Sequence, residues 1–277
     1  MGTVIAVANQ KGGVGKSTTV INLGAALAMK GQRVLAIDMD PQGNTSSGLG
    51  IEKASLSLCT YDLLLHEAPA SQIKQSTAVP KLDVIPATLK LAGAEIELVS
   101  SFSRETRLKK ALEPLHEHYD YILIDCPPSL GLLTVNSLTA SDSVLIPIQC
   151  EYYALEGLSQ LTEVIRLVQG HLNKKLEIFG VLLTMYDSRT NLSDQVAGEV
   201  KNCFKEQTFK TVIPRNVKLS EAPSFGRSVF QYDERSRGAE AYMDLAVEIL
   251  KRSRLEQRKS MEGSAVVHIN AEKALTR

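Results

Sequence analysis

The sequence contains no tryptophan, only four cysteines and no excess of charge of either sign. The cysteines are far apart and none forms a C-x-x-C pair, so the spacing of a disulfide framework or a thiol metal site is missing. Lysine plus arginine and aspartate plus glutamate number 31 each, which means that no overall field attracts nucleic acid or a membrane. Any binding of a polyanion must therefore use a local basic patch.

Long hydrophobic runs are also missing. The longest apolar candidates are interrupted by charges, glycine or proline within about ten residues, which is too short to cross a bilayer. Nothing at the N-terminus resembles a secretory signal, so we expect a soluble cytoplasmic protein with reduced thiols. A chain of 277 residues with 44% hydrophobic content is long enough to bury the core of one large α/β domain.

A glycine-rich stretch near the N-terminus carries the strongest functional signal. It follows the apolar residues 4–8 and reads Asn9-Gln10-Lys11-Gly12-Gly13-Val14-Gly15-Lys16-Ser17-Thr18-Thr19. A glycine-rich loop between a strand and a helix is typical of a phosphate-binding loop, because its backbone N–H groups converge on the anion at the positive end of the helix. Lys16 would reach the β- and γ-phosphates, and the Ser17 hydroxyl would be a ligand of Mg²⁺.

This loop departs from the common pattern G-x-x-x-x-G-K-[ST] at its first position. Gln10 stands where the first glycine is usual, and a second lysine, Lys11, follows it. In one interpretation Lys11 is an ordinary solvated loop residue. In the other, Lys11 reaches a second nucleotide across a symmetric dimer interface and supplies positive charge to the phosphoryl transition state.

Strand and helix patterns alternate along most of the remaining chain. The strand candidates are short continuous apolar runs, so we predict a doubly wound α/β fold with a mostly parallel sheet and helices on both faces. Further strands are expected at residues 33–37, 82–85, 119–125, 143–148, 179–185 and 212–214, and helices at 61–65, 91–99, 104–116, 154–168, 191–204 and 238–252. Residues 44–57, rich in Gly, Ser and Thr, are expected to form a surface loop.

Aspartates follow two of these strands. Asp38 and Asp40 come at the end of the second strand, and Asp125 ends the strand of residues 119–125. Ligands of open α/β sheets bind at the carboxyl ends of the strands, so these carboxylates are expected beside the phosphate loop. Asp125 is predicted to act as a Walker B aspartate that orients water bound to Mg²⁺. The competing interpretation is that Asp125 caps the next helix, although two prolines intervene.

The C-terminal end loses the alternating pattern. Residues 253–277 mix basic residues with Ser, Gly and Glu and contain no Trp, Tyr or Phe. We expect a solvated, flexible tail after a domain of residues 1–252, rather than a membrane-surface helix, which needs a coherent apolar face.

Three motifs together resemble the ParA/MinD group of deviant Walker A ATPases, a branch of the P-loop NTPases. They are the phosphate loop, Asp38-Met39-Asp40-Pro41-Gln42-Gly43-Asn44, and Asp125-Cys126-Pro127-Pro128-Ser129-Leu130-Gly131. Residues 149–158 and 213–223 agree as well, and within the group the chain is most similar to the chromosomal ParA (Soj) partition proteins. The resemblance covers residues 1–252 and leaves the tail without a match.

The resemblance implies an ATP-dependent sandwich dimer with ATP and Mg²⁺ at its interface. Lys11 of each subunit would contact the phosphates held by the other subunit. Asp40 would position the attacking water, and Asp38 would bind the direct ligands of Mg²⁺ rather than the metal itself. The residues implied for ATP are Lys11, Gly12, Gly13, Val14, Gly15, Lys16, Ser17 and Thr18, with Met185, Pro214 and Asn216 around the adenine. Those implied for the metal are Ser17, Asp38 and Asp125, and those for catalysis are Lys11, Lys16 and Asp40.

The resemblance also implies that the ATP dimer binds DNA without sequence preference, through basic residues of both subunits. The candidates are Arg189, Lys218 and Arg227, with Arg215 and Lys201 as weaker ones. Each of these could instead be an ordinary solvated charge. A ParB-type partner would stimulate slow ATP hydrolysis and so drive chromosome or plasmid segregation by a cytoplasmic, nucleoid-associated protein.

Two other functions are compatible with the same loop. A membrane-associated spatial regulator similar to MinD would need an amphipathic C-terminal helix. A redox or metal-cluster ATPase similar to nitrogenase iron protein would need cysteines that meet at a dimer axis. Cys126 and Cys150 lie near strand ends, but they are more simply interpreted as small buried residues.

Overall fold

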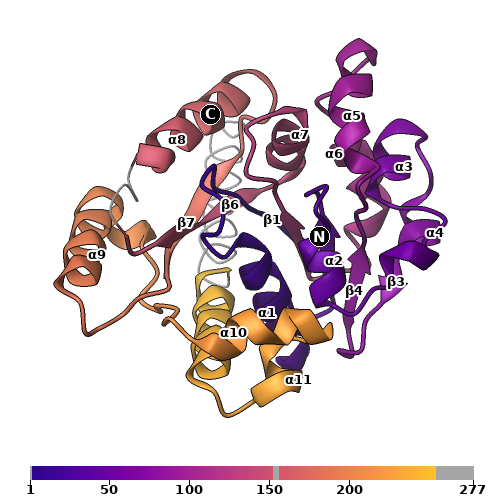
Figure 1. Cartoon of the computed structure of the whole chain (residues 1–277). Coiled ribbons are helices and arrows are strands. Elements are labelled where there is room, and N and C mark those ends of the chain that lie inside the picture. Colours follow the sequence, from indigo (N-terminus) through magenta and orange to yellow (C-terminus); the bar gives the residue numbers. More distant parts are fainter. Residues whose placement is uncertain (1, 152–155, 254–277) are drawn as a thin grey trace, which may run out of the picture.

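The computed structural model describes residues 2–151 and 156–253. Its centre is a seven-stranded sheet in the order β3-β4-β2-β5-β1-β6-β7 (Figure 1). The strands are β1 (Thr3–Val7), β2 (Val34–Asp38), β3 (Gln75–Ser76), β4 (Leu82–Ile85), β5 (Tyr121–Asp125), β6 (Ser143–Gln149) and β7 (Glu177–Thr184). Every neighbouring pair among them is parallel except β3 and β4, so the predicted doubly wound α/β fold is confirmed.

Helices cover both faces of this sheet. One face carries α1 (Lys16–Met29), α10 (Val217–Glu221), α11 (Val229–Asp233) and a further helical run over residues 237–253. The other carries α3 (Thr60–Leu65), α5 (Leu91–Glu97), α6 (Arg107–Leu112), α7 (Leu132–Ala140), α8 (Glu156–His171) and α9 (Asn191–Phe204). In Figure 1, α7 and α8 lie above the strands and α1, α10 and α11 below them. Each face therefore has its own apolar core.

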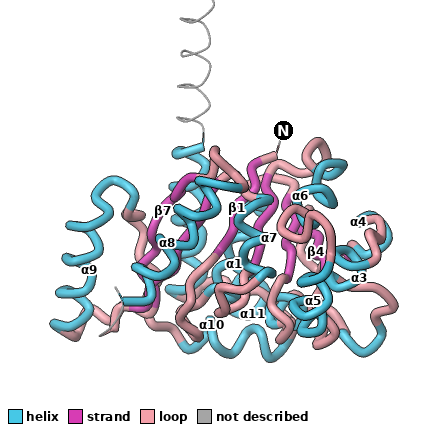
Figure 2. The backbone as a smooth tube through the Cα atoms, turned by 90° about the horizontal axis from the view of Figure 1, so that it is seen from above, coloured by secondary structure: helices cyan, strands magenta, loops and turns pink. Residues whose placement is uncertain are grey.

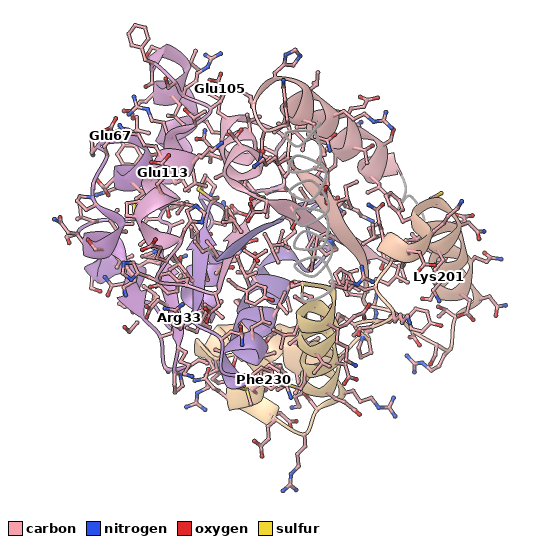
Figure 3. All side chains as sticks on the ribbon, turned by 180° about the vertical axis from the view of Figure 1, so that it is seen from behind. Arg33, Glu67, Glu105, Glu113, Lys201 and Phe230 are labelled. Atoms are coloured by element: carbon pink, nitrogen blue, oxygen red, sulfur yellow. The ribbon has the colours of Figure 1, made fainter. Side chains whose placement is uncertain are left out.

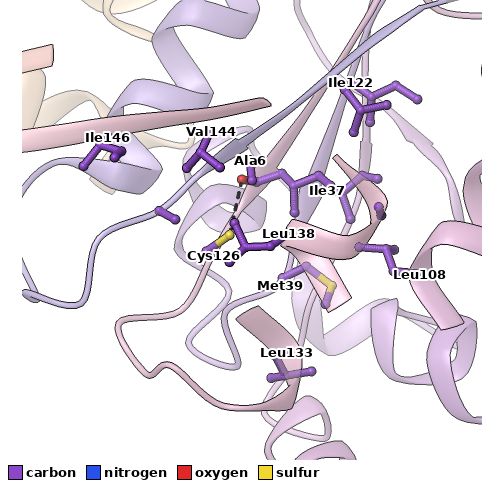
Figure 4. Close-up of a cluster of buried hydrophobic side chains, with 14 of the residues drawn as sticks. Ala6, Ile37, Met39, Leu108, Ile122, Cys126, Leu133, Leu138, Val144 and Ile146 are labelled. Carbon is purple, nitrogen blue, oxygen red and sulfur yellow. Dashed lines mark hydrogen bonds between the residues drawn. The ribbon is translucent and has the colours of Figure 1, made fainter. Parts of the chain in front are cut away.

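The alternation of side chains along the strands builds these two cores. On β1, Ala6 faces the core shared with α6 and α7, whereas Ile5 faces the core shared with α1. Figure 4 shows Leu108 of α6 and Leu133 of α7 among the side chains of the first core. Because both faces are covered, the central strands are apolar at almost every position, which is why they could be recognised as continuous runs.

The carboxyl ends of the parallel strands meet at one edge of the sheet. β1 starts near the N-terminus, at the top of Figure 2, so the strand ends face the bottom of that view, where α10 lies. In the register of β2 and β5, Asp38 stands beside Asp125, and Val7 of β1 stands on the other side of Asp125. The phosphate loop after β1 and the acidic strand ends therefore share an edge, as predicted.

Residues 44–57 are more ordered than their composition predicts. They begin with α2 (Asn44–Gly48) and include the 3₁₀ helix η1 (Lys53–Ser55). Thr45 and Ser46 are fully buried, and their hydroxyls bond to aspartates. The expected surface loop is therefore wrong, because small hydroxyl residues can be packed inside when a buried carboxylate accepts their hydrogen bonds.

The predicted strand at residues 212–214 is also wrong. Within the part of the chain that the structure describes, an isolated bridge pairs Tyr186 with Pro214, outside the named strands. Proline has no N–H to donate to a ladder, which explains why the pairing does not extend into a strand. The short antiparallel strand β3 at the other edge of the sheet was not expected from the sequence.

Most predicted helices are confirmed within a few residues. The helices predicted at 91–99 and 104–116 each end as 3₁₀ turns, η2 (Leu98–Ser100) and η3 (Glu113–Leu115). A short helix that was not predicted, α4 (Ala70–Ile73), lies between α3 and β3. The predicted start of α8 at residue 154 and the predicted tail after Ser253 lie outside the described residues. Among the described residues, none of the helices combines the length and the apolar character that spanning a membrane requires.

Candidate functional site

The phosphate loop joins β1 to α1 and depends on two glycines with left-handed backbone. Gly13 has φ +75° and Gly15, the residue before α1, has φ +91°. Other residues rarely adopt such angles, so glycine is required at both positions. Thr184, the last residue of β7, stabilises the loop, because its Oγ1 donates to the Val14 carbonyl at 2.8 Å.

Lys16 is a buried cation inside this loop. Its Nζ donates to the Lys11 carbonyl at 3.2 Å. Burial lowers the pKa of the Lys16 ammonium, and the nearby Asp125 carboxylate opposes that change. A buried ammonium at the start of a helix, where backbone N–H groups are also free, is suited to bind the phosphates of a nucleotide.

Lys11 is half-buried at the start of the loop. Its backbone N–H donates to Asn9 Oδ1 at 3.0 Å, and Asn9 Nδ2 donates to the Pro147 carbonyl at 2.7 Å. Gly12 and Gly13 beside it are exposed, and a Cβ at Gly12 would meet no atom within 4 Å. The start of the loop is thus fixed to β6, while the next residues face outward.

Three carboxylates stand opposite the loop. Asp38 and Asp125 are fully buried, and Asp40 is nearly so. The Asp40 N–H donates to Asp38 Oδ1 at 3.2 Å, and the Gln42 N–H donates to Asp40 Oδ1 at 2.9 Å. These turn contacts fix the chain as it leaves β2.

The electrostatics of the two buried carboxylates oppose ionisation. Burial raises the pKa of Asp125, repulsion from Asp38 adds to the rise, and the nearby Ser17 and Thr45 hydroxyls oppose it. Burial likewise raises the pKa of Asp38, and hydrogen bonds from Ser46 oppose the rise. A bound cation would favour the ionised form of both groups.

These residues fit a nucleotide-borne Mg²⁺. Asp125 Oδ1 is buried and has no hydrogen-bond partner, so it can accept from a water ligand of a metal. Ser17, at the start of α1, supplies a hydroxyl on the same side. Among the described residues no group of three His, Cys, Asp or Glu side chains forms a ready-made metal cage. Mg²⁺ usually keeps several water ligands and is bound by one or two carboxylates together with phosphate oxygens.

The residues expected around an adenine come together on two joined segments. The Tyr186 N–H donates to the Ile213 carbonyl at 3.1 Å, and the Arg215 N–H donates to the Tyr186 carbonyl at 2.9 Å. Met185 and Pro214 are thereby neighbours of this pairing. Met185 has the left-handed φ of +51°, which is uncommon for a residue other than glycine.

Asn216, the third adenine candidate, caps α10. Its Oδ1 accepts from the Lys218 N–H at 2.8 Å, which commits the side-chain oxygen to the helix. An adenine contact from Asn216 would therefore use its amide nitrogen.

Among the three candidate DNA residues, Arg189 and Arg227 are exposed and Lys218 is half-buried, and two of the three have acidic partners. Arg189 Nη2 contacts Asp187 at 2.7 Å, and Lys218 Nζ contacts Glu221 at 3.0 Å. Arg227 is exposed on the segment after η5 (Ala222–Phe225). The Arg189 guanidinium is exposed although Asp187 is largely covered, and both members of the Lys218–Glu221 pair are partly exposed. Ion pairs open to solvent contribute little stability, so these cations could exchange their partners for phosphates.

The two weaker candidates are less favourably placed. Arg215 pairs with Glu151 at 3.2 Å. Lys201, labelled in Figure 3, is exposed on α9 at the β7 side of the molecule, whereas Glu67 lies on the opposite side. Whether Lys201 shares a surface with Arg189 in a DNA complex stays a prediction.

The cysteines do not form a cluster site in the described part of the chain. Burial raises the pKa of Cys126 to about 12 and that of Cys150 to about 11. Cys59 is buried as well, and Cys203 on α9 is exposed. Buried protonated thiols agree with the interpretation of Cys126 and Cys150 as small packing residues.

Sequence reasoning missed the residues that hold the carboxylates. Thr45 and Ser46 of α2 bond to Asp125 and Asp38, and Thr184 bonds to the loop. The available signal was the run of hydroxyl residues that directly follows the acidic motif and Gly43. A hydroxyl beside a functional carboxylate often orients it.

Comparison with known proteins identifies the family of the chain. A model of the AAA domain family matches residues 2–178. The chain is 66% identical to the sporulation initiation inhibitor protein Soj of Bacillus subtilis, over 90% of this chain and 98% of that protein. It is 55% identical to the chromosome partitioning protein ParA of Myxococcus xanthus, over 91% of this chain and 89% of that protein.

A solved structure shows the same fold with a nucleotide in place. Cobyrinic acid a,c-diamide synthase of Mycobacterium smegmatis, with bound ADP and magnesium, matches with a TM-score of 0.81 and 39% identity, and the match covers 92% of this chain and 96% of that chain. The phosphate loop and the strand-end carboxylates of the present chain are of the kind that ATP and Mg²⁺ require. With its second lysine, its glycine loop and its two strand-end aspartates, the chain belongs to the ParA/MinD family of deviant Walker A P-loop ATPases.

Proposed function

We propose that this ATPase is a nucleotide-switched partition protein. In the ATP state two copies form a sandwich dimer that binds DNA without sequence preference, and hydrolysis, stimulated by a ParB-type partner, returns the protein to a state that releases DNA. Its place would be the cytoplasm, on the nucleoid. The similarity to proteins named Soj and ParA supports this assignment.

The observation that carries the proposal is the position of Lys11. Lys16 is buried within its own loop and bonds to the Lys11 carbonyl, while Lys11 is half-buried and directly precedes the exposed Gly12 and Gly13. A rim of glycines lets a second backbone approach closely. A cation there can reach phosphates held by a partner subunit and stabilise charge that develops during phosphoryl transfer.

The carboxylates divide the remaining work. When bound, Mg²⁺ neutralises charge on the phosphates. Ser17 and Asp125 would hold the metal and its water, and Asp38 would support them from the neighbouring strand. Asp40, which is nearly fully buried beside these groups, would orient the attacking water. The protein would accelerate hydrolysis mainly by positioning these groups and stabilising charge, and acid–base catalysis by its side chains would contribute little.

DNA binding would depend on dimerisation. The chain carries no net charge, so a single basic patch is modest. Two patches containing Arg189, Lys218 and Arg227, joined in one dimer, would contact more phosphates than either alone. Affinity for DNA would then require ATP and fall steeply with salt.

The test compares wild-type protein with a Gly12→Val variant in ATP-dependent DNA binding at low and high salt. A side chain at Gly12 is accommodated within one chain, because nothing lies within 4 Å of the added Cβ. We expect Gly12→Val to bind ATP, to stay monomeric with ATP, and to lose DNA binding. A variant that dimerises and binds DNA normally would contradict the proposal.

A parallel arm addresses the membrane alternative. Wild-type protein is sedimented with anionic liposomes and, separately, with DNA, each with ATP. Sedimentation with DNA alone supports the partition function. Sedimentation with liposomes alone would replace it with a MinD-like role.

A further inference from the structure

Two neighbouring residues of α2 reach the two buried carboxylates of the site. Thr45 Oγ1 donates to Asp125 Oδ2 at 2.7 Å, and Ser46 donates to Asp38 Oδ2 through its N–H at 2.8 Å and its hydroxyl at 2.7 Å. All four residues are fully buried. The helix is therefore attached to the ends of β2 and β5 at the same time.

The two carboxylates differ in whether both of their oxygens accept hydrogen bonds. Both oxygens of Asp38 accept hydrogen bonds, because Oδ1 takes the Asp40 N–H, and the Ser46 hydroxyl also accepts from the Ala87 N–H at 2.9 Å. On Asp125 the Thr45 hydroxyl occupies Oδ2, whereas Oδ1 has no partner. Leaving a buried carboxylate oxygen unpaired is costly, so such an atom points to a ligand.

We propose that Thr45 is a positioning residue for the Mg²⁺ site. Its hydroxyl holds Oδ2 and thereby fixes the plane of the Asp125 carboxylate, so that the unpaired Oδ1 is presented to the water ligands of the metal. This inference rests on the metal role proposed above for Asp125. Groups that orient a metal-binding side chain typically improve metal affinity by about 10–100-fold.

The local backbone places Thr45 for this contact. Gly43, just before α2, has φ +64°, and a Cβ there would lie 2.8 Å from the Ala87 carbonyl oxygen. The chain can therefore turn sharply after Asp40 and bring the first turn of α2 under β5. The Thr45 side chain is fully buried there, so its hydroxyl bonds to Asp125 and not to solvent.

The experiment measures how much Mg²⁺ is needed for binding of a fluorescent ATP analogue. Thr45→Val keeps the shape and removes the hydroxyl, and Thr45→Ser keeps the hydroxyl. We expect Thr45→Val to raise the half-maximal Mg²⁺ concentration about tenfold, with Thr45→Ser close to wild type. Affinity for the analogue in EDTA should be the same for all three proteins, since Thr45 contacts the carboxylate and not the phosphates.

Thr211→Val is the matched control. Its Oγ1 also donates to a carboxylate, Glu248 Oε2, at 2.8 Å. The other hydrogen bonds to Glu248 come from the Lys210 and Thr211 N–H groups and from Arg252, and not from the phosphate loop. This variant should lose a similar amount of stability and keep the wild-type Mg²⁺ requirement. If it shifted the requirement as much as Thr45→Val, the effect would be one of general stability and the inference would be wrong.

Asp125→Ala separates the inference from the role on which it rests. If Asp125→Ala raises the Mg²⁺ requirement and Thr45→Val does not, Thr45 has no positioning role and the assignment of Asp125 stands. If Asp125→Ala also leaves the requirement unchanged, both fail. Should Thr45→Val not fold, Thr45→Ala replaces it, and equal Mg²⁺ requirements for Thr45→Ala and Thr45→Ser would overturn the inference.

Discussion

Asp38 and Asp125 stand side by side at the ends of neighbouring parallel strands, in direct register and fully buried. Burial raises the pKa of both carboxyl groups, and their mutual repulsion adds to the rise for Asp125. Two anions in this position destabilise the metal-free fold. The arrangement is nevertheless suited to a site that receives a divalent cation together with its nucleotide.

Replacing one of the pair should stabilise the protein in the absence of metal. Because the folded pKa of Asp125 is raised, the folded chain holds protons that the unfolded chain releases, and the unfolding free energy of wild type should fall as pH rises from about 4 toward the raised pKa. Asp125→Asn should flatten that slope and add about 1–2 kcal/mol at neutral pH. Chemical denaturation in EDTA from pH 4 to 8 measures this, and a variant with the wild-type slope would refute it.

Asp40→Ala should separate binding from turnover. The Asp40 carboxylate accepts from the Gln42 N–H, and its influence on Lys16 of the phosphate loop is electrostatic and smaller than that of Asp125. Nucleotide binding and ATP-dependent dimerisation should therefore persist. Hydrolysis should fall by at least about 100-fold, because the attacking water loses its orienting group. Phosphate release and size-exclusion chromatography with ATP check the two halves. Hydrolysis at the wild-type rate would remove Asp40 from the catalytic residues.

Gly43→Ala should weaken the fold at the site. The alanine would have to adopt a φ of +64° and would press its Cβ against the Ala87 carbonyl. We expect a loss of about 1–3 kcal/mol in unfolding free energy, measured by urea denaturation. Gly170→Ala on α8 is the control, because the added Cβ meets nothing there and should be neutral or slightly stabilising.

Charge reversal should identify the DNA surface. Arg189→Glu or Lys218→Glu should weaken ATP-dependent DNA binding by about tenfold or more and reduce its salt dependence, since each removes a phosphate contact. Lys109→Glu, at an exposed position of α6, is the matched control. ATP binding should be unchanged in all three. A reversal that leaves DNA affinity at the wild-type value would remove that residue from the surface.

Glu248→Gln should cause a pH-dependent loss of stability. Burial alone would raise the pKa of Glu248, but hydrogen bonds from the Lys210 and Thr211 N–H groups, the Thr211 hydroxyl and Arg252 hold it below its ordinary value. A lowered folded pKa contributes stability above about pH 4.5, and this contribution is lost as pH falls through the folded value.

The variant should therefore be about 1–3 kcal/mol less stable at pH 7, and the difference should shrink below about pH 4.5. Thermal and urea unfolding across this range measure it. Glu240→Gln, exposed on the same helical run, should show neither effect. A difference that stays constant with pH would mean that the carboxylate charge of Glu248 is not involved.

The sheet and the phosphate loop could be predicted because their signals are local. Continuous apolar runs follow from burial of both faces of β1, β2 and β5, and the glycines at 13 and 15 follow from the backbone angles of the loop. The shared edge of Asp38 and Asp125 followed from the rule that parallel strands end together.

The interior of the site could not be predicted in the same way. Thr45 and Ser46 are polar residues in a Gly- and Ser-rich segment, and only their partners explain why they are buried. Those partners lie up to 80 residues away in the sequence. Pairing across such a distance depends on tertiary structure, which local composition does not encode.

The uneven exposure of the cysteines has a practical consequence. Cys59, Cys126 and Cys150 are enclosed in the fold, while Cys203 near the end of α9 faces outward. A maleimide dye should therefore react with the native chain mainly at Cys203, without any change to the sequence. A fluorophore on Cys203 would lie on the same side of the molecule as β7 and could be used to follow the formation and dissociation of the proposed dimer in real time.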